Sequence, residues 1–151
     1  IRTARKVAKN YPGIDLWETN IDAQCMWLVK NPEDYEVIVA ENMFGDILSD
    51  ITSALVGGVG LAPSANLNMG GVSMFEPVHG SAPDIFGQGI SNPVAATLTA
   101  ALLLDHLGCA AGAASIRGAV EGAIEAGERT ADIGGSISTR QCGEAIRRRL
   151  A

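Results

Sequence analysis

Two aspartates four residues apart are the first candidates for chemistry. Asp46 and Asp50 lie in residues 44–55, where apolar residues recur at helical spacing. On a helix this spacing places both carboxylates side by side on one face, where they repel each other unless a positive charge lies between them. A hard cation such as Mg²⁺ or Mn²⁺, which prefers oxygen ligands, suits such a pair. The alternative is that both acids simply face solvent, and the pair alone does not decide between the two.

The second candidate is a loop rich in glycine and proline that runs from Glu76 to Asn92. Small residues permit close approach of the backbone to a ligand, and the prolines stiffen the loop. A carboxylate at Asp84 can accept hydrogen bonds from two ribose hydroxyls and would repel a 2′-phosphate, which is how an acidic residue selects NAD in other folds. The alternative is a stiff surface loop with a packed His79.

The elements that must position these residues follow from periodicity and from turn residues. The pattern is typical of an α/β protein. Helices are expected at residues 2–10, 21–29, 44–55, 94–107, 113–126 and 140–150, and strands at 14–19, 35–40 and 73–78. Residues 57–71 and 79–91 are expected to be loops. The helix at 94–107 is apolar all round, so it must be buried inside a domain or in an oligomer.

Composition excludes several classes of partner. A net charge of −6 argues against binding to nucleic acid or to an anionic membrane, because either requires a concentrated basic patch. The run Arg147–Arg149 is interpreted as a solvated helix end. Three widely spaced cysteines fit neither a disulfide framework nor a zinc site, and they favour a cytoplasmic location. No stretch is apolar enough to span a bilayer.

Four segments, taken together, closely resemble the isopropylmalate/isocitrate/tartrate (D-malate) dehydrogenase family. They are NMFGDILSD at 42–50, GVGLAPSAN at 58–66, FEPVHGSAPDI at 75–85 and ISNP at 90–93. Their order and spacing both match the family. The resemblance implies the C-terminal portion of an isopropylmalate-dehydrogenase-like α/β fold, made of parts of two domains that share a long sheet, without a Rossmann G-x-G-x-x-G turn.

The resemblance also implies roles for individual residues. Asp46 and Asp50 would bind the catalytic Mg²⁺ or Mn²⁺, and Asp22 would reach the same metal from the partner subunit of a homodimer. The family's NADP-using members have Lys and Tyr where Asp84 and Ile85 stand, so NAD is expected. The residues expected to bind NAD are Glu76, His79, Gly80, Ser81, Ala82, Asp84, Ile85 and Asn92.

The family comparison further implies that the chain is only half of an enzyme. It opens within a helix and without a starting Met. The missing N-terminal half would supply the Tyr and Lys acid–base pair and the residues that grip substrate carboxylates. A domain boundary is expected near Val56 and Gly57. Residues 1–56 would then belong to the smaller substrate, metal and dimerisation domain, and residues 57–151 to the larger NAD-binding domain.

The expected activity is metal-dependent oxidative decarboxylation of a (2R)-malate-type hydroxy acid by NAD. The cation would polarise the hydroxyl being oxidised and then stabilise the enolate left when CO₂ departs. Tartrate, D-malate and 3-isopropylmalate are favoured over isocitrate as substrates. The alternative is a non-catalytic regulatory subunit of the same family that binds a nucleotide or an acid as effector. The presence of Asp22, Asp46 and Asp50 together argues against it.

Overall fold

The structure, a computed structural model, describes residues 1–150. The chain forms two compact units, Ile1–Thr52 and Ser53–Ala151. The division falls a few residues before the expected boundary at Val56 and Gly57. It lies within one helix, which begins in the first unit and ends in the second.

The first unit is built from helices joined by extended segments. Its helices are α1 (Arg2–Ala8), α2 (Ile21–Lys30), the short 3₁₀ turn η1 (Pro32–Asp34) and the greater part of α3 (Asn42–Leu55). The three α-helices confirm the periodicity read from the sequence. A bidentate ion pair between Arg5 and Glu18 joins α1 to the segment that follows it. Arg5 donates from Nε to Glu18 Oε1 at 2.5 Å and from a terminal guanidinium nitrogen to Oε2 at 2.7 Å. This hydrogen bonding lowers the pKa of Glu18.

The two strands expected in the first unit are absent from the described structure, so both predictions are wrong for this chain. Residues 14–19 and 35–40 form no strand, although the rings of Trp17 and Tyr35 stack with centroids 5.3 Å apart. A strand exists only where its backbone groups pair with a neighbour. Val37 and Val39 are 83% and 85% exposed, which is the pattern of a core strand without its sheet.

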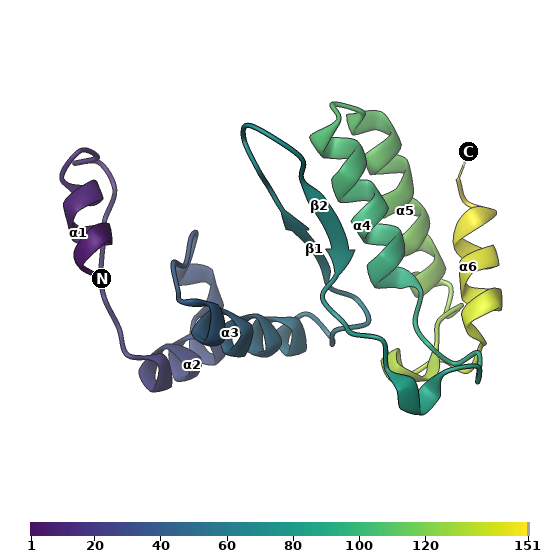
Figure 1. The fold of residues 1–151 in the computed structure, drawn as a ribbon. Coiled ribbons are helices and arrows are strands. Elements are labelled where there is room, and N and C mark those ends of the chain that lie inside the picture. The colour runs from purple at the N-terminus through teal and green to yellow at the C-terminus, as the bar shows by residue number, and fades with distance from the viewer. Residues whose placement is uncertain (151) are drawn as a thin grey trace. The chain divides into compact units, whose positions relative to one another are not determined.

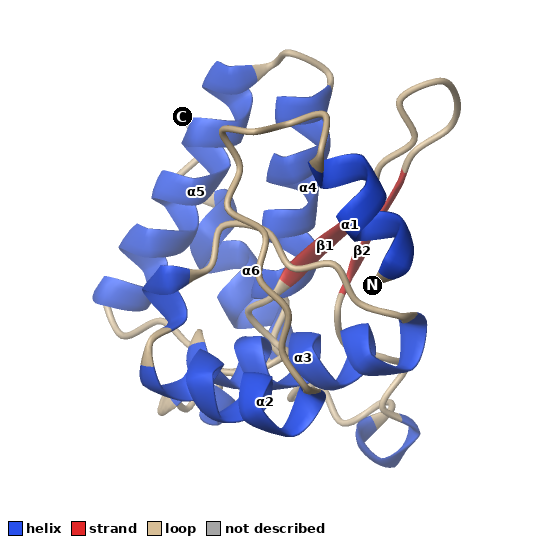
Figure 2. Ribbon diagram, turned by 90° about the vertical axis from the view of Figure 1, so that its left-hand side faces the viewer, coloured by secondary structure: helices blue, strands red, loops and turns tan. Residues whose placement is uncertain are grey.

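The second unit contains an antiparallel hairpin, coloured red in Figure 2. Strand β1 (Pro63–Asn66) pairs with β2 (Met74–Pro77), with Pro63 opposite Pro77 and Asn66 opposite Met74. β2 confirms the strand expected at 73–78. β1 lies in a region expected to be loop. The Gly and Asn residues around it concealed a strand of four residues, since short strands carry little periodic signal.

Three helices complete the second unit, and Figure 1 shows the hairpin, α4 and α5 side by side. They are α4 (Val94–His106), α5 (Ala110–Glu125) and α6 (Thr139–Arg147). α4 contacts both strands and α5, and α5 contacts α6. The shared core consists of buried residues from all three helices: Val94, Ala119, Val120, Ala123, Cys142, Ala145 and Ile146.

The packing explains why α4 is apolar all round. Strands cover one part of its surface and α5 covers another, so its burial takes place within the unit and does not by itself require a partner. Among residues 1–150, no helix has both the length and the apolar character needed to cross a membrane.

Candidate functional site

The candidate metal-binding acids lie on the exposed side of α3. Asp46 and Asp50 are exposed, whereas Leu48 between them is only 6% exposed. Neither carboxylate accepts a hydrogen bond or forms an ion pair within residues 1–150. The helix is reinforced locally, because Ser49 Oγ donates to the carbonyl of Asp46 at 3.0 Å. Two adjacent carboxylates with no protein cation between them form a donor set that fits a hard divalent cation.

Asp22 lies on a different helix of the same unit. It occupies the first turn of α2, is exposed, and accepts a hydrogen bond from the backbone N–H of Ala23 at 2.8 Å. The structure does not bring Asp22 together with Asp46 and Asp50. Within the described part of the chain, no three His, Cys, Asp or Glu side chains are grouped closely enough to hold a metal. A single chain therefore offers two of the three expected ligands in one place.

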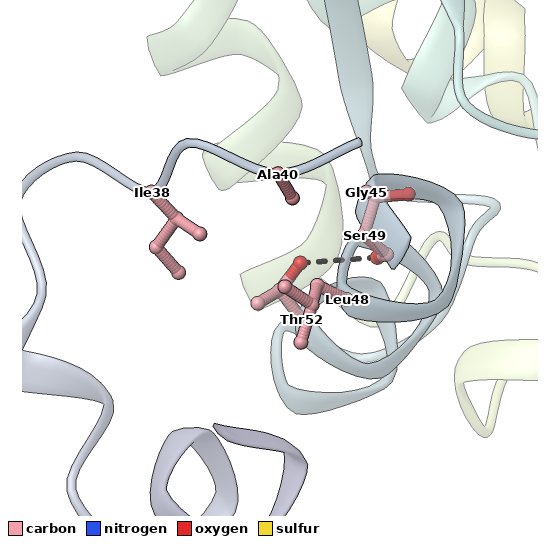
Figure 3. A pocket seen from close by; sticks show the side chains of 6 residues that line it. All are labelled: Ile38, Ala40, Gly45, Leu48, Ser49 and Thr52. Atoms are coloured by element: carbon pink, nitrogen blue, oxygen red, sulfur yellow. Dashed lines mark hydrogen bonds between the residues drawn. The ribbon is translucent and has the colours of Figure 1, made fainter. Parts of the chain in front are cut away.

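A hollow beside α3 is distinct from this acidic face (Figure 3). Thr52 Oγ1 donates to the carbonyl of Ser49 at 3.0 Å at its edge, and neither Asp46 nor Asp50 lines it. The lining residues are Ile38, Ala40, Gly45, Leu48, Ser49 and Thr52. Because the lining is largely apolar and includes the unpaired segment 35–40, it is better suited to protein packing than to a charged ligand.

The candidate nucleotide loop begins at the end of β2. Glu76 is exposed within the strand, opposite Ser64. His79 is half-buried, and its Nδ1 donates to the carbonyl of Gly80 at 2.9 Å. Gly80 and Ser81 follow and are exposed. This part of the loop thus presents small, exposed residues to its surroundings.

A sharp turn then places the carboxylate expected to select the cofactor. Ala82 has a left-handed backbone with φ of 42°, which a non-glycine residue adopts only at some cost. The 3₁₀ turn η2 (Pro83–Ile85) follows, with Asp84 exposed in its first turn and Ile85 half-buried. Gln88 Nε2 donates to the carbonyl of Asp84 at 2.8 Å, so its backbone is held while its carboxylate stays accessible. Residues 76–92 contain no Lys or Arg.

Asn92 differs from the rest of the loop because it is only 7% exposed. Its Oδ1 accepts a hydrogen bond from the N–H of Val94, the first residue of α4, at 3.0 Å. Its Nδ2 donates to Asp132 Oδ2 at 2.9 Å. Asp132 was not among the predicted site residues. The signal for it was the turn sequence Asp-Ile-Gly-Gly, but forty residues separate it from Asn92 and no local pattern pairs them.

The run of arginines lies at the end of α6, and the side chains of Arg147 and Arg148 are largely exposed, as expected for a solvated helix end. The three side chains also form ion pairs, which the sequence did not indicate. Arg147 pairs with Glu144 at 2.9 Å, whereas Arg148 and Arg149 pair with the two oxygens of Glu128 at 2.7 and 2.6 Å.

Comparison with known proteins points to one family of dehydrogenases. Residues 2–146 match the isocitrate/isopropylmalate dehydrogenase family. The 3-isopropylmalate dehydrogenase of Archaeoglobus fulgidus is 50% identical over 91% of this chain and 42% of its own length. A probable tartrate dehydrogenase/decarboxylase of Bacillus subtilis is 48% identical over 97% of this chain and 42% of its own.

Solved structures agree with these sequence matches. The isocitrate dehydrogenase of Methylococcus capsulatus superposes with a TM-score of 0.92 at 41% identity, covering 99% of this chain and 44% of that one. The chain thus spans less than half the length of the relatives it matches. Because both the sequence match and the fold extend along almost all of its residues, the chain belongs to the isocitrate/isopropylmalate dehydrogenase family.

Proposed function

We propose that this chain is the metal- and NAD-binding part of an NAD-dependent dehydrogenase that oxidises and decarboxylates a (2R)-malate-type hydroxy acid. The observation that carries the proposal is the exposed pair Asp46 and Asp50 on α3, whose carboxylates have no partner within residues 1–150. Surface acids on a helix usually separate from one another or pair with a cation. Two neighbouring carboxylates without a protein partner, in a chain that belongs to a family of dehydrogenases, are a reason to expect a bound ligand there.

The metal site is completed by a second copy of the chain. Asp46 and Asp50 would hold Mg²⁺ or Mn²⁺ together with Asp22 of the other subunit of a homodimer. When bound, such a cation polarises the hydroxyl and stabilises negative charge on oxygen. The chain's own contribution is to keep both carboxylates on a rigid helix, where the burial of Leu48 fixes the rotation of α3.

The loop from Glu76 to Asn92 would bind the adenosine half of NAD, whose nicotinamide half would accept the hydride. Exposed small residues allow its backbone to approach the nucleotide, and Asp84 is placed to accept hydrogen bonds from ribose hydroxyls. The unit that begins at Ser53 would thus be the nucleotide-binding part, and the preceding unit the substrate, metal and dimerisation part. The proton-transferring Tyr and Lys would come from the rest of the enzyme.

The substrate belongs to a set of related acids. Relatives named for 3-isopropylmalate, isocitrate or homoisocitrate, and tartrate are 48–50% identical to this chain, so identity does not separate them. We propose tartrate, D-malate or 3-isopropylmalate ahead of isocitrate. Assaying the complete protein with each acid, NAD and Mn²⁺ gives the order of kcat/KM values directly.

The metal assignment predicts a specific loss. In the complete protein, Asp50→Asn keeps the size of the side chain but removes a ligand charge, so turnover at a fixed Mn²⁺ concentration should fall by roughly two orders of magnitude or more. Calorimetric titration with Mn²⁺ should show correspondingly weaker binding. The matched control is Asp15→Asn, an exposed acid in the same unit, which should change neither quantity. Unchanged Mn²⁺ binding in Asp50→Asn would contradict the assignment.

A further inference from the structure

The loop proposed to bind adenosine is fastened at its C-terminal end by a segment far away in sequence. We call residues 130–139 the tether. Asp132 of the tether accepts from Asn92 Nδ2 at 2.9 Å through Oδ2 and from Thr130 Oγ1 at 2.5 Å through Oδ1. Thr130 is fully buried, so this end of the tether is anchored in the interior.

The same tether holds the loop at a second place. The backbone N–H of Thr139 donates to the carbonyl of Gly89 at 2.8 Å, and its hydroxyl donates to the carbonyl of Ser91 at 2.5 Å. Thr139 is the first residue of α6, whose Ser138 forms a capping box with Gln141. The helix start is thereby fixed, and with it the two donors of Thr139.

Close packing leaves little freedom at the junction. A methyl group added at Gly60 would meet Asp132 Oδ2 at 3.0 Å and Asn92 Cβ at 3.1 Å. The carbonyl of Gly60 also accepts from the N–H of Ala95 at 2.9 Å. The Asn92–Asp132 hydrogen bond is therefore enclosed by backbone from a third segment, which limits the positions that Asn92 can adopt.

Building on the NAD site proposed above, we infer that Asp132 and Thr139 are positioning residues for adenosine binding. They act through the loop and not by touching the nucleotide. Both ends of the Asn92 amide are engaged by protein, at Val94 and at Asp132, so its side chain serves to hold residues 89–92 in one conformation. A loop fixed before the ligand arrives loses less conformational entropy when the ligand binds.

The test uses the complete protein and exchanges the two residues that form the Asn92–Asp132 hydrogen bond. Asp132 accepts from two donors, and Asp132→Asn leaves only one acceptor oxygen for both. Asn92→Asp places two carboxylates against each other. In the double variant the amide introduced at 132 donates to the carboxylate introduced at 92, which still accepts from Val94. The hydrogen bond is restored with its direction reversed.

Binding is measured by calorimetric titration with NAD and with ADP-ribose, which contains the adenosine half but lacks nicotinamide. Each single variant should bind both ligands about tenfold more weakly, and the double variant should recover most of the loss. In Asp132→Asn at saturating NAD, kcat should change by less than about twofold, because the reacting groups lie elsewhere. Asp105→Asn, which breaks an exposed ion pair with Arg117, is the control and should bind normally.

Thr139 supplies an independent pair of variants. Thr139→Val keeps the shape and removes the hydroxyl, so it should weaken ADP-ribose binding several-fold, whereas Thr139→Ser should bind nearly as the wild type does. The inference would be overturned if Asp132→Asn bound ADP-ribose as tightly as the wild type does. It would also be overturned if the folded double variant did not recover the lost affinity. Neither result would contradict the proposed NAD site. A wild-type protein that binds neither ligand would overturn the proposed NAD site as well.

Discussion

Asp84 and Asn92 belong to one loop but have opposite environments. Asp84 is exposed and its carboxylate accepts no hydrogen bond within the described residues, whereas both ends of the Asn92 amide are bonded to protein. The first is the environment of a group that meets a ligand, and the second is that of a group that supports the backbone. The family resemblance implies one cofactor-binding set for both residues, and residue type alone does not reveal which hydrogen bonds are already made.

The environment of Asp84 predicts cofactor choice. A 2′-phosphate brings negative charge against its carboxylate, and residues 76–92 offer no Lys or Arg to compensate. In the complete protein, kcat/KM for NAD should exceed that for NADP by about a hundredfold or more. Asp84→Asn should reduce this ratio mainly by improving NADP, and Asp84→Lys combined with Ile85→Tyr should reduce it further. Equal use of both cofactors by the wild type would show that Asp84 does not face the ribose.

Cys142 and Cys109 are expected to differ in reactivity because their environments differ. Cys142 is 1% exposed within the core, and burial, with smaller contributions from Asp132 and Glu128, raises the pKa of its thiol. Cys109 is exposed at the start of α5. The thiolate is the reactive form, so a raised pKa and lack of access both slow modification.

Alkylation at pH 8 followed by peptide mass spectrometry measures how fast each thiol is modified. Cys109 should react within minutes, and Cys142 only on the timescale of unfolding. Because the folded-state pKa of Cys142 is raised, the protonated thiol favours the folded state, and this stabilisation is lost as the pH rises above the unfolded value. Cys142→Ala should therefore flatten the alkaline decline in the free energy of unfolding. Rapid labelling of Cys142 in folded protein would contradict its placement.

At the scale of elements, helices were predicted well and strands poorly. The helical pattern is contained within each segment, so α2, α3 and α4 lie close to the expected residues. A strand depends on a partner elsewhere in the chain or outside it. Residues 35–40 have the composition of a buried strand and remain unpaired, because the described chain supplies no neighbouring strand.

The positions of the candidate site residues could also be predicted only where they depend on local spacing. Both aspartates of α3 could be placed on one face from their spacing alone. The tether could not be predicted, since its contacts join Asn92 to Asp132 and Ser91 to Thr139 across forty residues or more. Such contacts depend on the packing of α6 against α5, which no local pattern encodes.

Helix α5 offers a test of its packing through two glycines. Gly118 has open space where a Cβ would lie, so Gly118→Ala should raise the free energy of unfolding by about 0.5–1 kcal/mol through helix propensity. At Gly122 a Cβ would lie 3.3 Å from Arg149 Cδ, so Gly122→Ala should gain less. Urea unfolding monitored by circular dichroism measures both. A larger gain at Gly122 than at Gly118 would contradict the packing of Arg149 over α5.

The chain spans less than half the length of the relatives that it matches. Its first unit buries few side chains and leaves Trp17, Val37 and Val39 exposed, whereas its second unit has a core shared by three helices. Exposed apolar residues of this size are normally covered by other protein. Tests of the proposed metal site therefore use the complete protein.

The proposed homodimer makes a quantitative prediction about the activity of mixed variants. If Asp46 and Asp50 of one subunit meet Asp22 of the other, a hybrid of Asp22→Ala and Asp50→Asn subunits has one intact site and one doubly damaged site. Random exchange makes half of the dimers hybrid, so a mixture of two inactive variants should recover about a quarter of wild-type activity.

The matched control mixes Asp46→Asn with Asp50→Asn. Both residues lie on the same α3, so every site in that hybrid keeps one lesion and no activity should return. Subunit exchange is verified by native mass spectrometry with one isotope-labelled variant. Recovery in the first mixture and not in the second requires that Asp22 act across the interface. Recovery in neither mixture, with exchange demonstrated, would show that Asp22 does not act across the interface. Recovery in both would show that Asp46 and Asp50 do not serve one metal.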